Sequence, residues 1–449
     1  MVACCEETSA AHRSEEPVAT KLQRIAKKAR QEPSFRFTNL YYLMNEELLR
    51  GCFQRLKKDA AAGIDNVTKE MYAEKLDANL ANLLERLHKM AYIPQPVRRT
   101  YIPKPGSDKL RPLGITCVED KLVQAGLVRI LETVYEQDFI GDSYGFRPKR
   151  SCHQALRTLN VTVEKGMVNF IAEADIKGFF TNMDQSWIMK FLGHRIGDRL
   201  VLRMVKRFLR AGIMEDGELL VSDEGAPQGG TISPLLSNLY LHYTLDIWFE
   251  KVFRKSCTGF ARLIRFADDF VVCFQNTTDA ERFREELVKR LGKFNLEVEP
   301  SKTKVIKFGR FAAKRAAAKG EKPETFDFLG FTHYCSTKRD GTGFRVKRAT
   351  ASKKFTAKLA AFKEWLKKSR TMKTAELWDN AKAKLRGHYA YYGVTDNTQG
   401  IKRFSHEVKN LLFKWLNRRG KRGCLNWQKF NKMLALFPLP EPRIKVSMY

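Results

Sequence analysis

Over the first three quarters of the chain, apolar residues follow two different periods. Residues 119–135, EDKLVQAGLVRILETVY, and 281–294, ERFREELVKRLGKF, place apolar side chains three or four positions apart, as on one face of an α-helix. Residues 168–180, VNFIAEADIKGFF, form a near-continuous apolar run instead, which predicts a buried strand. Helices that alternate with strands in hairpins predict an α+β fold with an antiparallel sheet.

Two stretches predict hairpins. Residues 97–115, VRRTYIPKPGSDKLRPLGI, have strand-like ends around the turn-forming triplet PGS and carry five basic residues. Residues 263–274, LIRFADDFVVCF, are an apolar run that contains two adjacent aspartates. Successive residues of a straight strand face opposite sides, so Asp268 and Asp269 can serve one site only if a tight turn lies there. The alternative is a turn with two solvated aspartates, for which Asp is a favoured residue.

Past about residue 345 the strand-like pattern ends. ASKKFTAKLAAFKEWLKKS, TAELWDNAKAKLRGHYAYYG and SHEVKNLLFKWLNRRGK carry apolar residues three or four apart, with lysine and arginine between them. From Arg345 onward there are 26 Lys or Arg against 6 Asp or Glu, a net charge of +20. We therefore expect a separate, basic, helical binding domain.

The whole chain of 449 residues is also basic. Its 81 Lys and Arg against 50 Asp and Glu give a net charge of +31, so the expected partner is nucleic acid or an acidic membrane surface. No run of about 18 apolar residues predicts a spanning helix, and MVACCEETSAAHRSEEP does not resemble a secretory signal. Nine cysteines without a CxxC pair argue against a disulfide framework or a four-ligand zinc site. We expect a cytosolic protein without a membrane partner.

A third carboxylate changes the interpretation of the aspartate pair. Asp175 lies between Ala174 and Ile176 in the predicted strand, and an isolated buried carboxylate is costly without a counter-charge. Three acids brought together repel each other unless divalent cations lie among them. Mg²⁺ takes one or two protein carboxylates plus substrate phosphates, and two ions about 3.5 to 4 Å apart can activate a hydroxyl and stabilise a leaving pyrophosphate. A basic protein with such a site is expected to be a nucleotidyl transferase.

The ordered motifs resemble a known family. ADIKGFF, PQGGTISPLLSN and RFADDFVV are similar to the palm motifs of reverse transcriptases, specifically those encoded by group II introns. GIDNVT, DSYGFRPKRSCHQAL, NLEVEPSKTK, FDFLGF and LRGHYAYYGV resemble further family blocks, so the resemblance covers nearly everything from Lys21 onward. FADD stands for the commoner YADD, and Thr181 stands where the family more often has aspartate.

The resemblance implies a right-hand polymerase fold. The expected organisation is a mobile tail over residues 1–20, fingers and palm with an antiparallel sheet over 21–340, and an all-helical basic thumb/maturase domain over 341–449. Only Cys424 and no histidine follows His406, so we expect no DNA-cleaving domain of the kind that many such proteins carry.

The resemblance also implies roles for the acids. Asp175 and Asp268 are the expected ligands of two Mg²⁺ ions, with Mn²⁺ as a substitute, and Asp269 is a weaker candidate in the same cluster. The full implied metal set is Asp175, Ile176 through its carbonyl, Asp268 and Asp269. Lys302 resembles the lysine proposed to protonate the departing pyrophosphate, and Lys304 is equally near in sequence.

A second implied set binds the incoming nucleotide. Phe180 would lie under the sugar and exclude a 2′-hydroxyl, so deoxynucleotides are favoured; an ordinary core phenylalanine is the alternative. Arg111 would clamp the triphosphate by paired hydrogen bonds and Lys104 as a point charge. Gly229 would allow close approach of the backbone, and Gln228 can bond to sugar or base. The set is Lys104, Arg111, Gly178, Phe179, Phe180, Gln228 and Gly229.

In the helical domain, we expect aromatic residues to form the core and basic residues to bind RNA phosphates without sequence readout. The candidates are Lys367, Lys368, Arg370, Arg386, Arg418, Arg419, Lys421 and Arg422. FDFLGF, residues 326–331, either packs under the primer strand or is a plain buried strand.

The implied function is that of an RNA-directed DNA polymerase and intron maturase of the bacterial cytosol or nucleoid. It would bind its group II intron RNA, assist splicing, and copy the RNA into DNA from deoxynucleoside triphosphates and a primer at the DNA target. One alternative is a domesticated reverse transcriptase in defence or repair. Another is an RNA-binding maturase without polymerase activity, against which three costly acids argue. The sequence leaves open whether the chain forms a homodimer.

Overall fold

The structure is a computed structural model that describes residues 16–103, 110–215, 218–220, 225, 229–338, 340–418 and 425–449. Five of the expected site residues lie outside the described residues: Lys104, Gln228, Arg419, Lys421 and Arg422. Most of the expected mobile tail over 1–20 also lies outside them, and its last three residues already belong to helix α1. Among the described residues, no helix combines the length and the apolar composition needed to span a membrane.

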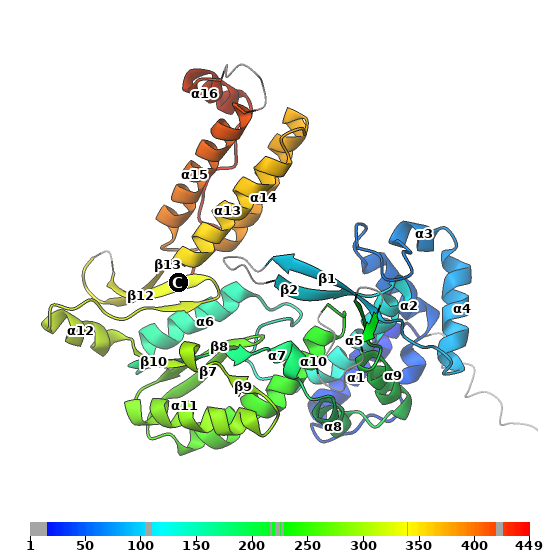
Figure 1. The fold of residues 1–449 in the computed structure, drawn as a ribbon. Coiled ribbons are helices and arrows are strands. Elements are labelled where there is room, and N and C mark those ends of the chain that lie inside the picture. Colours follow the sequence, from blue (N-terminus) through cyan, green and yellow to red (C-terminus); the bar gives the residue numbers. More distant parts are fainter. Residues whose placement is uncertain are drawn as a thin grey trace, which may run out of the picture.

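The amino-terminal part forms a helical fingers region, seen at the right of Figure 1. Its helices are α1 (Val18–Gln31), α2 (Glu46–Arg55), α3 (Lys69–Ala73), α4 (Leu76–His88), α5 (Val118–Tyr135), α8 (Gln185–Arg195) and α9 (Arg199–Leu209). Leu43, Leu83, Leu127 and Val205 are fully buried where these helices meet. Helical periodicity along the sequence therefore identified the apolar faces correctly.

The basic hairpin is confirmed. Strand β1 (Val97–Pro103) pairs antiparallel with β2 (Leu110–Ile115). Two short strands, β5 (Ile213–Glu215) and β6 (Glu218–Leu220), extend the sheet in the order β2-β1-β5-β6. This small sheet projects from the fingers helices toward the centre of the molecule (Figure 1).

The palm contains an antiparallel sheet in the order β10-β3-β8-β7. Its strands are β3 (Phe170–Ala174), β7 (Ala261–Phe266), β8 (Asp269–Phe274) and β10 (Lys304–Lys307). Alternate side chains enter two different cores: Val272 packs with α10 (Ser233–Leu241) and α11 (Thr277–Gly292), whereas Val271 packs with α6 (Cys152–Lys165) and the thumb. Burial on both faces explains why these strands are near-continuous apolar runs.

The single strand predicted over 168–180 is wrong in one respect, because it breaks at Asp175. Strand β3 ends at Ala174, and the chain continues as β4 (Ile176–Lys177), which pairs with β9 (Glu297–Val298) in a separate two-stranded sheet. The Glu299 amide donates to the Asp175 carbonyl at 2.8 Å, which draws the chain toward β9. Helix α7 (Phe179–Asn182) then begins after Gly178, whose φ of 55° suits glycine.

A third sheet connects palm and thumb. It consists of β11 (Phe326–Phe328), β12 (Phe331–Thr337) and β13 (Phe344–Thr350), preceded by α12 (Arg310–Ala318). Strand β13 lies inside the range expected to be all-helical from residue 341, and the helices begin only at Ser352. Fully buried Val346 and Arg348 alternate with outward residues along β13. Because the buried residue Arg348 is basic, the sequence of this strand resembled the start of the basic helical domain.

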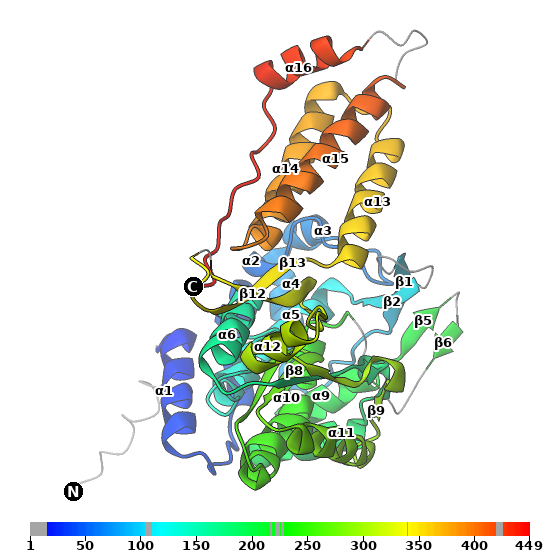
Figure 2. The ribbon, with the colours of Figure 1, turned by 90° about the vertical axis from the view of Figure 1, so that its left-hand side faces the viewer.

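The thumb is a bundle of α13 (Ser352–Lys368), α14 (Thr374–Tyr392) and α15 (Thr398–Leu416), which stand side by side above the palm (Figures 1 and 2). The expected aromatic core is present, with Trp378, Tyr389, Tyr392 and Trp415 buried. After α16 (Trp427–Leu436), the chain runs back along the bundle to the palm (Figure 2), where Met448 is fully buried.

One ion pair lies in the middle of the palm. Arg265 of β7 and Asp246, in π-helical turns that continue α10, are both fully buried and join through two hydrogen bonds of 2.8 and 2.5 Å. Arg265 also donates to the Asn238 side chain and to the Ala267 carbonyl, each at 3.0 Å. The guanidinium therefore connects the helical segment that carries Asn238 and Asp246 with the turn at Ala267.

We predict that Arg265→Met destabilises the protein by about 3–5 kcal/mol, because it leaves the Asp246 carboxylate buried without a counter-charge. The measurement is the midpoint of chemical unfolding. Glu85→Gln, which removes an exposed pair with Lys89, is the control and should leave the midpoint unchanged. An Arg265→Met midpoint equal to that of the native protein would contradict the assignment.

Candidate active site

The two aspartates lie at the tip of the β7-β8 hairpin. Phe266 pairs with Asp269, so Ala267 and Asp268 form a two-residue turn between the strands. Ala267 has a φ of 57°, a left-handed conformation that this tight turn requires. The predicted tight turn is therefore present, and it is what lets both acids approach one region.

Contacts with Arg265 and Gly145 hold this turn in place. Arg265 donates to the Ala267 carbonyl at 3.0 Å. Gly145, in the loop before α6, lies so close that a Cβ there would be 2.2 Å from the Ala267 nitrogen. Its carbonyl accepts a 2.6 Å hydrogen bond from Asn238, which also binds Arg265. Sequence reasoning assigned no role to Gly145, Asn238 or Arg265, whose importance depends on contacts between distant segments.

Asp175 and Asp268 lie close enough to affect each other. Burial raises the pKa of Asp268, and the negative charge of Asp175 raises it further. Arg111 of strand β2 lowers it, which locates that guanidinium in the neighbourhood of the acids. The structure thus brings together two predicted metal ligands and one predicted nucleotide-binding residue from three separate segments.

Asp269 lies in a different setting. It lines two adjoining depressions, of about 490 and 770 Å³, and the surrounding protein raises the pKa of its carboxyl group to about 7. The charge of Asp268 adds to this rise, whereas a hydrogen bond from the Leu329 amide opposes it. Because Asp269 and Val271 share one face of β8, this side chain points toward the thumb.

A thumb residue supports the turn that contacts Asp269. Leu329, between β11 and β12, has a left-handed φ of 50°, and its carbonyl accepts a 2.9 Å hydrogen bond from the Tyr391 hydroxyl of α14. Phe331 stacks on the same tyrosine at 6.0 Å. The motif FDFLGF is thus a buried strand and turn whose phenylalanines are in the core, and one of its amides reaches the acidic cluster. Sequence reasoning missed this link, because Leu329 and Tyr391 are far apart along the chain.

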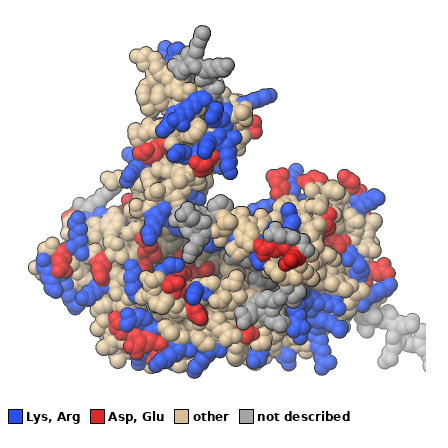
Figure 3. Space-filling model, viewed as in Figure 1, with Lys and Arg blue, Asp and Glu red and all other residues tan. Residues whose placement is uncertain are grey.

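Of the two candidate lysines, Lys302 faces the site. Its ammonium group forms an ion pair with Asp175, and this hydrogen bond raises the pKa of Lys302. Lys304 instead pairs with Glu173 at 3.5 Å. Both lysines line the smaller depression with Asp175 and Asp269, and Lys353 of α13 lies at its thumb side. Figure 3 shows acidic side chains gathered in the hollow beneath the thumb, with basic side chains around it.

Those expected nucleotide-binding residues that the structure describes lie on elements beside the acids. Phe180 is half-buried on α7 and packs edge-on against buried Phe179 at 5.4 Å. Gly229 has a φ of 115°, and a Cβ there would be 2.2 Å from the Gly114 carbonyl of β2. The close approach expected at Gly229 is therefore made to the backbone of the fingers hairpin. It brings Gly229 against the strand that carries Arg111.

The acids suit Mg²⁺ through their donor chemistry. Within the described part of the chain, no three His, Cys, Asp or Glu side chains come together as a complete metal-binding group. Mg²⁺ does not require one, because it takes one or two carboxylates and keeps water and substrate phosphates for the remaining positions. Asp175 and Asp268 provide two such carboxylates whose charges repel each other, so the residues fit this ion.

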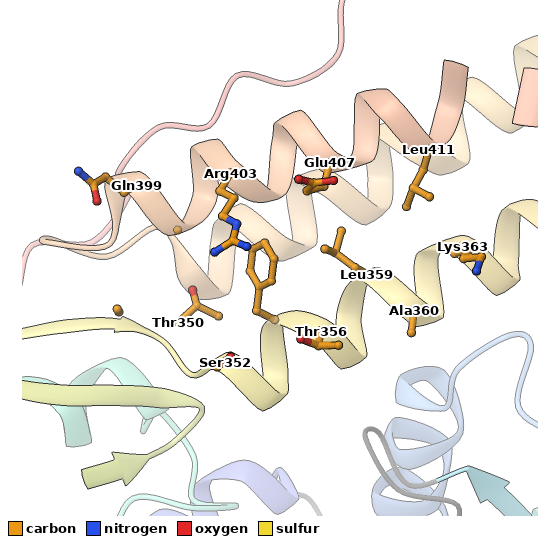
Figure 4. Close-up of a pocket in the computed structure, with 13 residues that line it drawn as sticks. Thr350, Ser352, Thr356, Leu359, Ala360, Lys363, Gln399, Arg403, Glu407 and Leu411 are labelled. Atoms are coloured by element: carbon orange, nitrogen blue, oxygen red, sulfur yellow. The ribbon is translucent and has the colours of Figure 1, made fainter. Parts of the chain in front are cut away.

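The expected RNA-binding residues that the structure describes are all exposed. They are Lys367 and Lys368 at the end of α13, Arg370 in the following loop, Arg386 on α14 and Arg418 after α15. A separate groove of about 610 Å³ lies between α13 and α15. Figure 4 shows Leu359 of α13 and Arg403 and Leu411 of α15 lining it. None of the expected RNA-binding residues lines this groove.

Comparison with known proteins identifies relatives. Residues 102–333 match the family described as reverse transcriptase (RNA-dependent DNA polymerase). The group II intron-encoded protein LtrA of Lactococcus lactis subsp. cremoris is 37% identical over 227 residues, which are 50% of this chain and 38% of that protein. Protein YkfC of Escherichia coli (strain K12) is 32% identical over 323 residues, 64% of this chain and 84% of that protein.

A more distant relative is the putative COX1/OXI3 intron 1 protein of Saccharomyces cerevisiae. It is 32% identical over 218 residues, which are 47% of this chain and 25% of that protein. The chain thus spans less than half of the length of LtrA and of this yeast protein.

Proposed function

Because the chain belongs to the reverse transcriptase family and is similar to group II intron-encoded proteins, we propose that it is an RNA-directed DNA polymerase and intron maturase. The observation that carries the polymerase proposal is the pair Asp175 and Asp268, which lie close enough at the end of the palm sheet for the charge of Asp175 to raise the pKa of Asp268, with Arg111 nearby. The partners proposed are group II intron RNA, a DNA primer at the target, and deoxynucleoside triphosphates.

The proposed chemistry assigns one task to each side chain. Asp175 and Asp268 hold two Mg²⁺ ions, with the Ile176 carbonyl as a further ligand and Asp269 as a less direct one. When bound, the ions activate the primer hydroxyl and stabilise the leaving pyrophosphate. Arg111 neutralises the triphosphate with its planar fork of donors, aided by Lys104. Gly229 holds its loop against the hairpin, and Gln228 contacts the sugar or base.

Lys302 is proposed to move a proton. Its Nζ carries a raised pKa beside Asp175, so it remains protonated at neutral pH and can donate to a departing phosphate oxygen. Lys304 is held by Glu173 on the next strand and is the less suitable donor. Helix α7 begins at Phe179 directly after Gly178, and Phe179 packs edge-on against Phe180. This contact fixes the position of the ring proposed to contact the sugar.

We predict that Asp268→Ala reduces primer extension on an RNA template with Mg²⁺ by about a thousandfold or more. Loss of several kcal/mol of charge stabilisation corresponds to such a factor. The measurement is single-nucleotide extension with deoxynucleotides. Asp379→Ala, at an exposed position on α14, is the control and should retain native activity. A native protein that adds no deoxynucleotides, or an active Asp268→Ala variant, would refute the polymerase proposal.

We predict that Phe180→Ala increases ribonucleotide relative to deoxynucleotide incorporation by about tenfold or more, because space opens for the 2′-hydroxyl. The measurement is the ratio of kcat/KM values for the two nucleotides. Phe311→Ala, which removes an exposed ring from α12, is the control. An unchanged ratio would leave Phe180 as an ordinary core phenylalanine.

The maturase proposal rests on the thumb and its exposed basic side chains. We predict that the native protein accelerates splicing of a cognate group II intron at near-physiological Mg²⁺, and that replacing Lys367, Lys368 and Arg370 with alanine weakens this effect and its salt dependence. Asp268→Ala should still assist splicing, because the RNA performs that chemistry. Equal splicing with and without the native protein would exclude a maturase role and would favour a domesticated polymerase.

A further inference from the structure

Strained backbone gathers around the catalytic turn. Among the described residues, eight non-glycine positions have a left-handed φ, and three of them adjoin this turn: Ala267 within it, Leu329 beside Asp269, and Phe146 next to Gly145. Such conformations persist only where the surroundings impose them, and they collect at functional sites. The tight turn requires this conformation at Ala267, and the Tyr391 hydrogen bond holds Leu329 in place. Phe146 differs from both, because its side chain is exposed.

Phe146 is forced outward by its neighbours. Gly145 is pressed against Ala267 and held by Asn238. On the other side, buried Arg147 pairs with Glu136 at 3.0 Å and donates to the carbonyls of Ile140 and Ser143 at 2.7 and 2.8 Å. The loop path is thus fixed on both sides of Phe146. Its φ is 58° and the residue is 54% exposed.

The properties of Phe146 do not suit a purely structural residue. A bulky side chain in the left-handed region is a genuine outlier, and glycine or asparagine would fit this backbone without strain. An exposed ring adds little to the core. A residue whose backbone is strained and whose ring is exposed is explained if the ring binds a ligand that lies beside the turn.

The position of the ring indicates which strand it would contact. Ser143, in the same loop, bridges to Arg265, so the loop extends the palm sheet beyond β7. Asp175 and Lys302 lie on the opposite side of the hairpin, with β3 and β10. In the proposed reaction, the growing end of the primer lies at the acids. A ring on the β7 side of the hairpin would therefore contact the template, which is the strand paired with the primer.

The surroundings of the ring suit a nucleic acid. Lys149 is exposed, and the Arg150 guanidinium lies 5.4 Å from the centre of the Tyr144 ring. Cations bind phosphates, whereas an exposed aromatic face can stack on any base. We propose that Phe146 stacks on a base of the template strand beside the catalytic turn and so fixes the template at the site of addition. This inference rests on the proposed polymerase function.

The stacking is tested with 2-aminopurine placed at successive positions of an RNA template annealed to a primer. With the native protein, fluorescence falls at one or two neighbouring template positions. Phe146→Ala restores the emission there and raises the Kd for the primer–template by about tenfold, and Phe146→Trp keeps the quenching. When 2-aminopurine is placed in the primer instead, its fluorescence is expected to be the same in all variants.

The thermal stability of variants distinguishes a base-stacking role of Phe146 from a packing role. Phe146→Gly relieves the strained backbone and therefore raises the midpoint of thermal unfolding, while template quenching is lost. Asn66→Gly is the control, because exposed Asn66 also has a left-handed φ, of 55°, but lies between α2 and α3, outside the loop of Phe146. It should not lower the midpoint and should keep the quenching. A lower midpoint for Phe146→Gly would overturn the proposal in favour of a packing role.

The remaining outcomes are distinct. Native-like quenching by Phe146→Ala at every template position overturns the proposal, and so does a change confined to primer positions. Quenching uses a bound duplex without nucleotide addition, so it is independent of catalysis. A native protein that binds the duplex with position-specific quenching but extends no primer refutes the polymerase function and leaves the stacking contact standing.

Discussion

The turn that carries Asp268 depends on one buried interaction, the ion pair of Arg265 with Asp246. A buried pair of this kind contributes little net stability over an apolar pair, but it is costly to break. Its value here is positional, since the same guanidinium also binds Asn238 and the Ala267 carbonyl. Through Asn238 and Gly145, it joins the palm sheet, the helix beneath the sheet and the loop beside it. Asp268 is presented by a turn that none of these segments could hold alone.

Energetically unfavourable features are concentrated around this ion pair and the acidic cluster. Two carboxylates repel each other, the pKa of Asp269 lies near neutrality, and three bulky or β-carbon-bearing residues adopt left-handed backbone. The two cores on either face of the palm sheet supply the compensating burial. The Tyr391 contact with Leu329 then connects the thumb to the acids, so the position of the thumb and the geometry of the site are linked.

Much of this architecture could be predicted from periodicity and motif order. The helices, both hairpins and the aromatic core of the thumb follow local patterns, whereas the association of Asp175 with Asp268 was expected from the order of the motifs and their resemblance to a family. The break at Asp175 could not be predicted, because apolar residues continue on both sides of it and the partner strand β9 is distant. Strand β13 was hidden by buried Arg348, and Arg265 was a polar interruption in an apolar run. In each case a polar group bonds to a partner elsewhere along the chain, Glu299, Asn160 or Asp246, which a linear pattern does not reveal.

The strand order of the palm sheet also determines how the chain can fold as it is synthesised. Strand β3 pairs with β8 (Asp269–Phe274) and β10 (Lys304–Lys307), which emerge from the ribosome about 100 and 130 residues later. Until then an apolar strand has two unpaired edges and two uncovered faces. Contacts of such long sequence separation fold slowly. Until β8 and β10 are synthesised, the strand that leads to Asp175 is therefore an aggregation hazard, which expression at low temperature or with chaperones is expected to reduce.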